Sequence, residues 1–237
     1  MFLDRLLATN QPLVNAAFEL HQSGELLPDT YILDLNMITR NAEAMKAEAD
    51  RNDISLYFML KQLGRNPLVA HRLQDIGFAG AVCVDFREAL TMERNGIRLG
   101  NVGHLVQTPK AAMHEIVSAR PDIMTVYSIQ KAREIGQVAE SLGFEQEIML
   151  RMIGPDDDLY PGQYAGFPLD ELPKTVDVIE GIAGVKIGGV CSFPCLLYSD
   201  VAHEVEPLPN AATVQKAAAY LEQHGYHGLE LNMPSAR

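Results

Sequence analysis

The stretch Ile54-Ser-Leu-Tyr-Phe-Met-Leu-Lys61, which is followed by Gln62-Leu-Gly64-Arg65-Asn66-Pro67, decides the fold. Its aliphatic, aromatic and β-branched residues favour a buried strand over 54–60, and the Gly and Pro that follow open a loop. The strand therefore delivers the Lys61 amine to its carboxyl end, which is the active-site face if the strand belongs to a parallel barrel.

Two interpretations of Lys61 stay open on position alone. The lysine marks the exit of the strand from the core, with its ammonium group in solvent, or its amine reacts with a carbonyl compound. A reactive amine must lose its proton, and both desolvation at a barrel mouth and the neighbouring cation of Arg65 favour that loss.

Composition and charge limit the function classes. The chain has 237 residues, of which 47% are hydrophobic and 21% charged, so it can build one large core of the α/β class. Its formal net charge of -12 argues against a nucleic-acid surface or an anionic membrane surface, because phosphate binding requires clustered Lys and Arg.

The cysteines and the N-terminus indicate a cytoplasmic protein. Cys83, Cys191 and Cys195 are an odd number in a chain too long to need disulfides, which suits a reducing compartment. Their spacing does not fit a zinc site, so we expect small buried residues and no metal. Met1-Phe-Leu-Asp4-Arg5 carries an acid where a signal peptide has cations, and no apolar stretch approaches about 18 residues.

Apolar strand candidates alternate with helical stretches along the chain. The predicted strands are 54–60, 80–84, 102–106, 123–127, 147–152, 185–190 and 229–231, and an earlier apolar run is Tyr31–Leu35; the predicted helices are 10–25, 37–49, 67–75, 87–95, 110–118, 129–142, 169–182 and 211–224. This order predicts a parallel sheet with right-handed crossovers. The chain lacks the glycine-rich fingerprints of nucleotide-binding open sheets, which favours a barrel.

Three features in chain order resemble the opening of the alanine racemase-like family of pyridoxal-phosphate enzymes, fold type III. They are the run Tyr31-Ile-Leu-Asp34-Leu35, then Asn41, then the strand that ends in Lys61. The long N-terminal helix and the Gln62–Pro67 loop make the chain most similar to the YhfX-type branch of this family. The resemblance covers nearly the whole sequence.

The resemblance implies that Lys61 forms a Schiff base with pyridoxal 5'-phosphate (PLP), the cofactor. It also implies that Asn232 and Ser235 lie beside the cofactor phosphate. Two positions depart from the family pattern: Tyr164 stands where an arginine usually contacts the cofactor, and Ser192 stands where a histidine often stacks on the pyridine ring. Both departures argue against alanine as the substrate.

The resemblance also sets the predicted architecture, an α/β fold with a (β/α)8 TIM-type PLP-binding barrel. The strand that ends in Lys61 becomes the first barrel strand, so the predicted barrel is incomplete: it has seven strands, and the eighth strand and the C-terminal β domain are absent. Residues 1–50 form an N-terminal helix, strand and helix before the barrel, and residues 51–237 form the truncated barrel. Open barrel edges favour association, so we expect a homodimer or a complementary chain that covers them.

Three further side chains are candidates at the barrel mouth. His104 either shuttles protons to the substrate or is a hydrogen-bonded core residue. Arg151 ends a strand, where its cation either holds the cofactor or a substrate carboxylate or is structural. Tyr164 flanks Gly162 in a loop that could contact the substrate. The run Asp156-Asp157-Asp158 is predicted to be a solvated loop, since no calcium-loop spacing follows it.

The predicted function is therefore a PLP-dependent amino-acid racemase-like protein in which Lys61 abstracts the α-proton. It is an isomerase of amino-acid metabolism only if a missing segment supplies the second base. Two alternatives stay open. One is a non-catalytic PLP-binding homeostasis protein or an inactive fragment, and the other is a class I Schiff-base aldolase, which needs a lysine and no cofactor but usually carries it on a later strand.

Overall fold

The computed structural model describes residues 2–234 and divides them into two compact units. The first contains the residues up to Leu56 together with His71–Phe78, and the second contains Tyr57–Ala70 and the residues from Ala79 onward. None of the helices in the described range is long and apolar enough to cross a membrane.

In the first unit, residues 31–34 form neither strand nor helix, although a strand was predicted there. The helices of this unit include α1 (Phe2–Thr9), α2 (Gln11–Gln22) and α3 (Leu35–Arg51). The predicted strand Tyr31–Leu35 is wrong, because Leu35 already begins α3 and Tyr31 has 87% of its surface exposed.

Asp34 explains this error. Its Oδ1 accepts the backbone N–H of Met37 at 2.9 Å, so the residue caps α3, and its Oδ2 accepts the Asn10 amide at 2.8 Å. The Met37 bond, followed by the Asn10 bond, lowers the pKa of Asp34. An Asp followed by a helical pattern is a helix start as readily as part of a strand.

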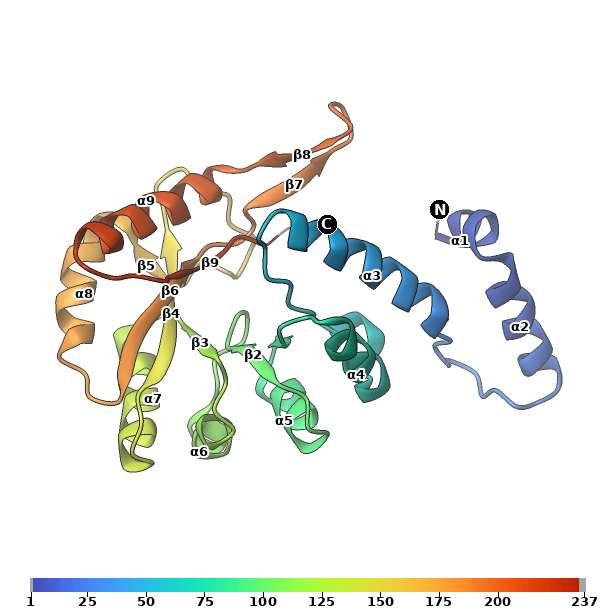
Figure 1. Ribbon diagram of the computed structural model, residues 1–237, viewed down its shortest axis with the longest axis horizontal. Coiled ribbons are helices and arrows are strands. Elements are labelled where there is room, and N and C mark those ends of the chain that lie inside the picture. Colours follow the sequence, from blue (N-terminus) through green and yellow to red (C-terminus); the bar gives the residue numbers. More distant parts are fainter. Residues whose placement is uncertain (1, 235–237) are drawn as a thin grey trace. The chain divides into compact units, whose positions relative to one another are not determined.

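From residue 61 onward, strands and helices alternate along the chain (Figure 1). The helices are the 3-10 turn η1 (Lys61–Leu63), α4 (Pro67–Ile76), α5 (Phe86–Arg94), α6 (Lys110–Ser118), α7 (Ile129–Ser141), the 3-10 turn η2 (Leu169–Glu171), α8 (Leu172–Glu180) and α9 (Pro209–Gln223). The strands are β1 (Ala81–Cys83), β2 (Leu99–Val102), β3 (Ile123–Val126), β4 (Gln146–Ile153), β5 (Phe167–Pro168), β6 (Val185–Cys191), β7 (Leu196–Ser199), β8 (Glu204–Pro207) and β9 (Glu230–Asn232).

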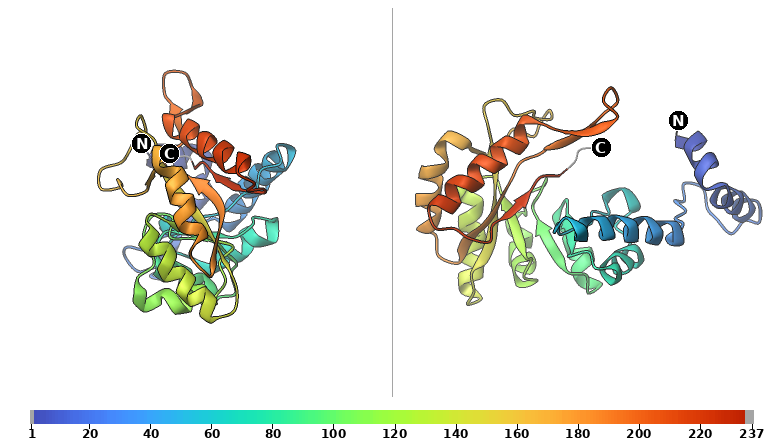
Figure 2. Two further views of the ribbon diagram at one scale, coloured as in Figure 1. Left: turned by 90° about the vertical axis from the view of Figure 1, so that its left-hand side faces the viewer. Right: turned by 45° about the horizontal axis from the view of Figure 1, so that its top comes forward.

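The main sheet is parallel and has the order β1-β2-β3-β4-β6-β9, with β5 paired to the end of β4. Helices α5 and α7 to α9 contact these strands and lie along one face of the curved sheet (Figure 2). The fold-class prediction is confirmed: the second unit is a parallel half-barrel of strands and helices.

Two predicted strands are displaced. The strand predicted over 54–60 is reduced to one bridge between Phe58 and Ala81, held by a 2.8 Å bond from the Val82 N–H to the Phe58 carbonyl. β2 ends at Val102, where the prediction placed a start, because Gly103 has a φ of 95°. A Cβ at Gly103 would lie 2.7 Å from the Thr125 carbonyl oxygen, so only glycine allows this turn.

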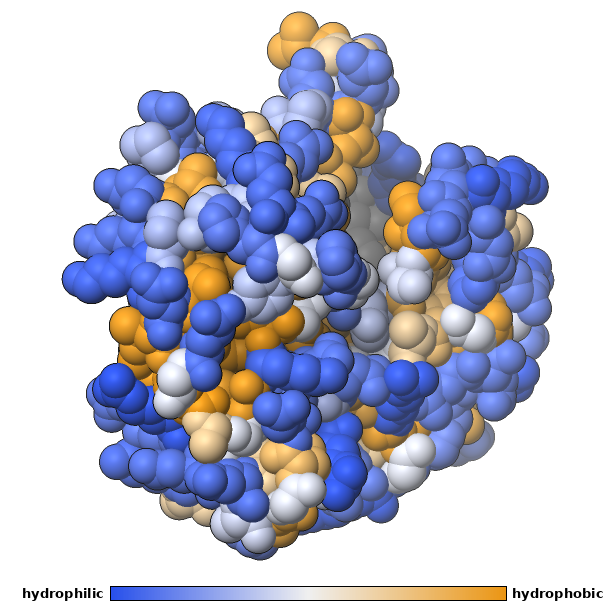
Figure 3. Space-filling view, turned by 60° about the vertical axis from the view of Figure 1, so that its left-hand side comes forward, coloured by the Kyte–Doolittle hydropathy of each residue, from blue (hydrophilic) through white to orange (hydrophobic). Residues whose placement is uncertain are grey.

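The antiparallel hairpin β7–β8 was not predicted. Its register places Leu196 opposite Pro207 and Tyr198 opposite Val205. Figure 3 shows hydrophobic atoms at the tip of this projecting hairpin, where Val201 is 94% exposed. The acidic and apolar residues of the segment give no clear alternation in the sequence, so its pattern did not indicate a strand pair.

The core residues Ile123, Met149 and Cys191 pack together, each with at most 1% of its surface exposed. Asn101 is also fully buried, and its Oδ1 accepts the Thr125 hydroxyl at 2.9 Å. All three cysteines are buried free thiols, as predicted from their spacing.

Candidate functional site

The carboxyl ends of the parallel strands carry the polar residues of the candidate site. They are Lys61 after the Phe58 bridge, His104 after β2, Tyr127 after β3, Arg151 near the end of β4, Ser192 after β6 and Asn232 at the end of β9. Because the strands are parallel, these residues share one edge of the sheet, which is the active-site edge in barrels of this type.

Lys61 is exposed at this edge. The buried Leu60 precedes it, and the Leu60 carbonyl accepts the backbone N–H groups of Leu63 at 2.9 Å and Arg65 at 3.0 Å. These two bonds turn the chain sharply as it leaves the core. The positive charge of Lys61 acts on the pKa of His104, so the two residues belong to the same site.

Arg151 is a buried cation that lacks a carboxylate partner. It is 2% exposed, its Nη1 donates to the Ala165 carbonyl at 3.0 Å, and its guanidinium lies 5.1 Å from the centre of the Tyr127 ring. None of the ion pairs formed by the described residues includes it, and its buried Nε has no hydrogen-bond partner. Buried charges are usually paired, so this guanidinium suits an anionic ligand.

His104 is buried beside both cations. Its ring meets the Phe193 ring edge-on at 5.8 Å, and its Nδ1 has no hydrogen-bond partner. Burial, and then the positive charges of Arg151 and Lys61, lower its pKa to about 4. The imidazole is therefore neutral near pH 7, and its unpartnered nitrogen can accept or donate one hydrogen bond.

Ser192 is held by protein groups on both sides of its hydroxyl. It donates to Asp157 Oδ2 at 3.3 Å and accepts the amide of Asn210 at 3.2 Å. The same Asp157 carboxylate accepts the Gly154 N–H at 2.9 Å and the Thr213 hydroxyl at 2.6 Å. Asp157 is thus an anchored residue, and the prediction that the whole run 156–158 is solvated is wrong at its centre.

Sequence reasoning missed Asp157, Asn210 and Thr213. Their contacts join the segment after β4 to α9, more than 50 residues away in sequence. The three consecutive aspartates look alike in the sequence. Only the fold shows that the Asp157 side chain is the one that accepts these hydrogen bonds. The one available signal was the polar Asn210 in the first turn of α9, a helix whose buried residues are mostly apolar.

The remaining predicted residues have fewer contacts that place them in the candidate site. Tyr164 is 64% exposed, and Tyr160 in the same loop places its ring 5.7 Å from that of Phe193. Asn232 is in register with Cys191 on the neighbouring strand. Ser235 lies outside the described residues. The structure therefore brings Lys61, His104 and Arg151 together and leaves Tyr164 on the surface.

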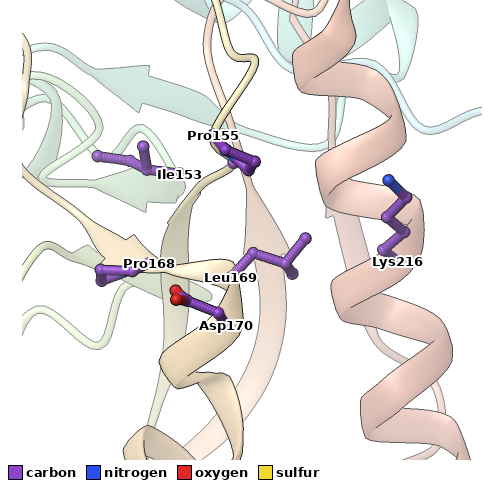
Figure 4. Close-up of a pocket in the computed structure, with 7 residues that line it drawn as sticks. Ile153, Pro155, Pro168, Leu169, Asp170 and Lys216 are labelled. Atoms are coloured by element: carbon purple, nitrogen blue, oxygen red, sulfur yellow. The ribbon is translucent and has the colours of Figure 1, made fainter.

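A separate cavity of about 470 Å³ opens at the base of the same loop (Figure 4). Its lining residues are Ile153, Gly154, Pro155, Pro168, Leu169, Asp170 and Lys216. Lys61, His104 and Arg151 do not line it. Across the described part of the chain, no group of three or more His, Cys, Asp or Glu side chains is arranged to hold a metal ion.

Comparisons with known proteins bear on the family and the fold. The sequence profile of the family described as "Alanine racemase, N-terminal domain" matches residues 33–235. The "Uncharacterized protein YhfX" of Escherichia coli strain K12 is 38% identical over 236 residues, which are 100% of this chain and 61% of that protein. The chain thus spans about three fifths of the length of this curated relative.

Solved structures share the fold at low identity. The diaminopimelate decarboxylase of Helicobacter pylori has a TM-score of 0.64 and 19% identity, with 89% of this chain and 55% of that one covered. The alanine racemase of Corynebacterium glutamicum has a TM-score of 0.63 and 15% identity, with 85% and 54% covered. The D-threonine aldolase of Filomicrobium marinum has a TM-score of 0.62 and 19% identity, with 82% and 53% covered.

The family match and the parallel half-barrel agree with each other, and the resemblance noted in the sequence is confirmed. The chain belongs to the alanine racemase N-terminal domain family.

Proposed function

We propose that this chain is the PLP-binding part of an amino-acid racemase-like protein, with Lys61 as the residue that carries the cofactor. The observation that carries the proposal is the exposed Lys61 amine at the carboxyl end of the half-barrel, near two buried basic groups, His104 and Arg151. Amino acids are the proposed substrates, a homodimer or a complementary chain the proposed assembly, and the cytoplasm the proposed location.

The described residues fit PLP, which brings an aldehyde, a phosphate and a ring hydroxyl. Lys61 offers an amine to the aldehyde. Arg151 is a buried cation without a carboxylate partner, and it suits an anionic oxygen. The unpartnered Nδ1 of His104 and Nε of Arg151 are buried polar atoms that a ligand would satisfy. Asn232 is proposed to lie near the phosphate, together with Ser235.

When bound, PLP withdraws electrons from the Cα of an attached amino acid, which makes the Cα proton acidic. In the proposed mechanism, the Lys61 amine takes this proton at Nζ on one face. Arg151 orients an anionic oxygen through its guanidinium. His104, neutral because it is buried, offers its unpartnered Nδ1 for one hydrogen bond to the bound molecule. Racemisation needs a second base on the opposite face of Cα, and we propose that a further segment or partner supplies it.

The reaction itself is open to test, because the racemase, decarboxylase and aldolase structures share this half-barrel. One observation favours a second candidate, a protein that holds PLP without turnover. Ser192 stands where the family often has a stacking histidine, and its hydroxyl is engaged by Asp157 and Asn210. Its position therefore contributes no ring to the cofactor site.

The first test adds PLP to the purified chain and records visible absorbance before and after borohydride reduction, followed by peptide mapping. We expect a reducible pyridoxyl group on Lys61 that is absent from Lys61→Ala. Lys174→Ala is the matched control, since Lys174 is an exposed lysine of a helix and does not belong to the candidate site. Labelling that persists in Lys61→Ala, or none in the wild type, would contradict the proposal.

A second measurement separates turnover from holding. The PLP-loaded chain is incubated with a panel of amino acids in deuterated water, and loss of the α-proton signal is followed by NMR. Proton abstraction predicts solvent deuterium at Cα, whatever reaction follows. A Lys61 adduct without α-exchange would favour the PLP-holding protein.

A further inference from the structure

The segment between β4 and β5, residues 154–166, is called the mouth loop below. It leaves the sheet after Ile153 and returns beside the strand it left, where Met152 pairs with Phe167 and Ile153 with Pro168. Tyr160 lies in this loop, and Arg151 holds its far end through the Ala165 carbonyl at 3.0 Å. The loop therefore carries side chains to the edge where Lys61 and His104 lie.

Asp157 fixes the near end of the mouth loop. Three donors from three different segments converge on its carboxylate: the Gly154 N–H at 2.9 Å, the Ser192 hydroxyl at 3.3 Å and the Thr213 hydroxyl at 2.6 Å. All three groups donate, and an ionised carboxylate has two oxygens that accept them. Hydrogen bonds to a charged acceptor are stronger than those between neutral groups.

Asn210 completes the anchor. It is fully buried, its Oδ1 accepts the Asp158 N–H at 3.0 Å, and its Nδ2 donates to the Asp158 carbonyl at 3.1 Å. The amide also donates to Ser192 at 3.2 Å. Asn210 therefore bonds to both the N–H and the carbonyl of Asp158. The Ser192 hydroxyl links the Asn210 amide to the Asp157 carboxylate.

The anchor ends next to the candidate site. Ser192 is followed by Phe193, whose ring lies 5.7 Å from the Tyr160 ring of the mouth loop and 5.8 Å from the His104 ring. These three rings form a continuous aromatic wall. The other two rings of this wall, those of Phe193 and Tyr160, lie close in sequence to the anchored residues Ser192 and Asp158.

We propose that Asp157 is a positioning residue of this site, which fixes the mouth loop and Ser192 so that Tyr160 packs against Phe193 and Phe193 packs against His104. Only the effect of Asp157 on PLP binding rests on the proposed function. The anchoring itself is a property of the free chain, and the first two measurements below need no cofactor.

The variants are Asp157→Asn and Asp157→Ala, with Asp156→Asn and Asp158→Asn as matched controls. The two control side chains are exposed neighbours, and the Asn replacements remove the same charge. Thr213→Val removes one of the three bonds to Asp157, and Thr213→Ser should restore it. This pair keeps the test open if the Asp157 variants fold poorly.

Hydrogen exchange of the mouth loop is the first readout. Loss of one or two bonds to a carboxylate predicts about tenfold to hundredfold faster exchange in peptides covering 158–166, with no change in β3. NMR titration of His104 is the second readout. Loosening of the wall admits water, so the pKa of His104, now lowered to about 4 by burial, should move back toward its ordinary value in the Asp157 variants.

The third readout is PLP affinity: we expect a dissociation constant about tenfold higher in the Asp157 variants than in the wild type. Unchanged loop exchange and an unchanged His104 titration in folded Asp157→Asn, Asp157→Ala and Thr213→Val would overturn the proposal. Similar changes in the Asp156 and Asp158 controls would also overturn it. Failure of wild-type Lys61 to take up PLP would instead count against the proposed function and leave the first two readouts intact.

Discussion

The Tyr57 hydroxyl donates a 3.2 Å hydrogen bond to the Glu230 carboxylate, across 173 positions of sequence. Tyr57 precedes the Phe58 bridge at one edge of the sheet, and Glu230 begins β9 at the opposite edge. The bond therefore spans the concave side of the half-barrel and helps to hold its curvature.

Replacement of Tyr57 by Phe removes this bond, which is one of the side-chain hydrogen bonds that the half-buried Glu230 accepts. We expect the free energy of unfolding to fall by about 1–3 kcal/mol, measured by urea denaturation. Tyr226→Phe is the control, because Tyr226 makes a similar 2.7 Å bond to Glu180 at the exposed surface, where the expected loss is below about 0.5 kcal/mol. Equal losses in both variants would show that burial does not strengthen the Tyr57 bond.

Glu230 should make stability depend on pH. Burial raises the pKa of Glu230 in the folded state, so the folded protein binds its proton more tightly than the unfolded chain does. Stability from this group is fully present at low pH and is lost as pH rises through the raised pKa. Glu230→Gln should therefore gain stability relative to wild type as pH increases from 4 to 8, and parallel curves would contradict this.

His104 should act in the opposite direction. Its pKa falls from 6.5 to about 4 on folding, so the unfolded state binds the proton first as pH decreases. Stability should rise with pH between those two values, by on the order of 3 kcal/mol at most. In His104→Gln, the free energy of unfolding should depend less on pH across this window, which urea denaturation at a series of pH values measures. An unchanged pH dependence would show that folding does not lower the pKa of His104.

Gly136 in α7 packs directly against the turn before β6. A Cβ there would lie 2.4 Å from the Ala183 carbonyl oxygen, so Gly136→Ala should cost about 1–3 kcal/mol despite the better helix propensity of alanine. Gly181→Ala is the control, since its nearest contact would be an ordinary 3.5 Å to Val178. The measurement is the melting temperature of the two variants. A higher melting temperature for Gly136→Ala than for Gly181→Ala would contradict the packing argument.

Elements with a clear local sequence pattern could be predicted, whereas those that depend on contacts with distant residues could not. Helix α6 matches its prediction at both ends, and the ends of β4 and β6 lie within one residue of theirs. Apolar runs bounded by glycine or proline can be recognised from the local sequence alone. The strand before Lys61 has the same local pattern but pairs at Phe58 alone. Its hydrogen-bond partner decides that outcome, and a single sequence does not display the partner.

The candidate site divides in the same way. Lys61 and Arg151 were recognisable because a charged residue at the end of an apolar strand is unusual in sequence. Asp157 was not, since its neighbours have the same charge and only the Ser192, Thr213 and Gly154 donors distinguish it. Sequence pattern identifies residues that stand out from their own segment, and tertiary contacts identify those that do not.

The β7–β8 hairpin leaves and rejoins the sheet region at one point, where the Leu208 N–H donates to the Cys195 carbonyl at 2.8 Å. Between these residues, β7 and β8 pair with each other. The hairpin is thus an interchangeable module: a reporter peptide placed at its tip, beside the exposed Val201, would extend outward while the strands that carry Lys61 and Arg151 keep their register.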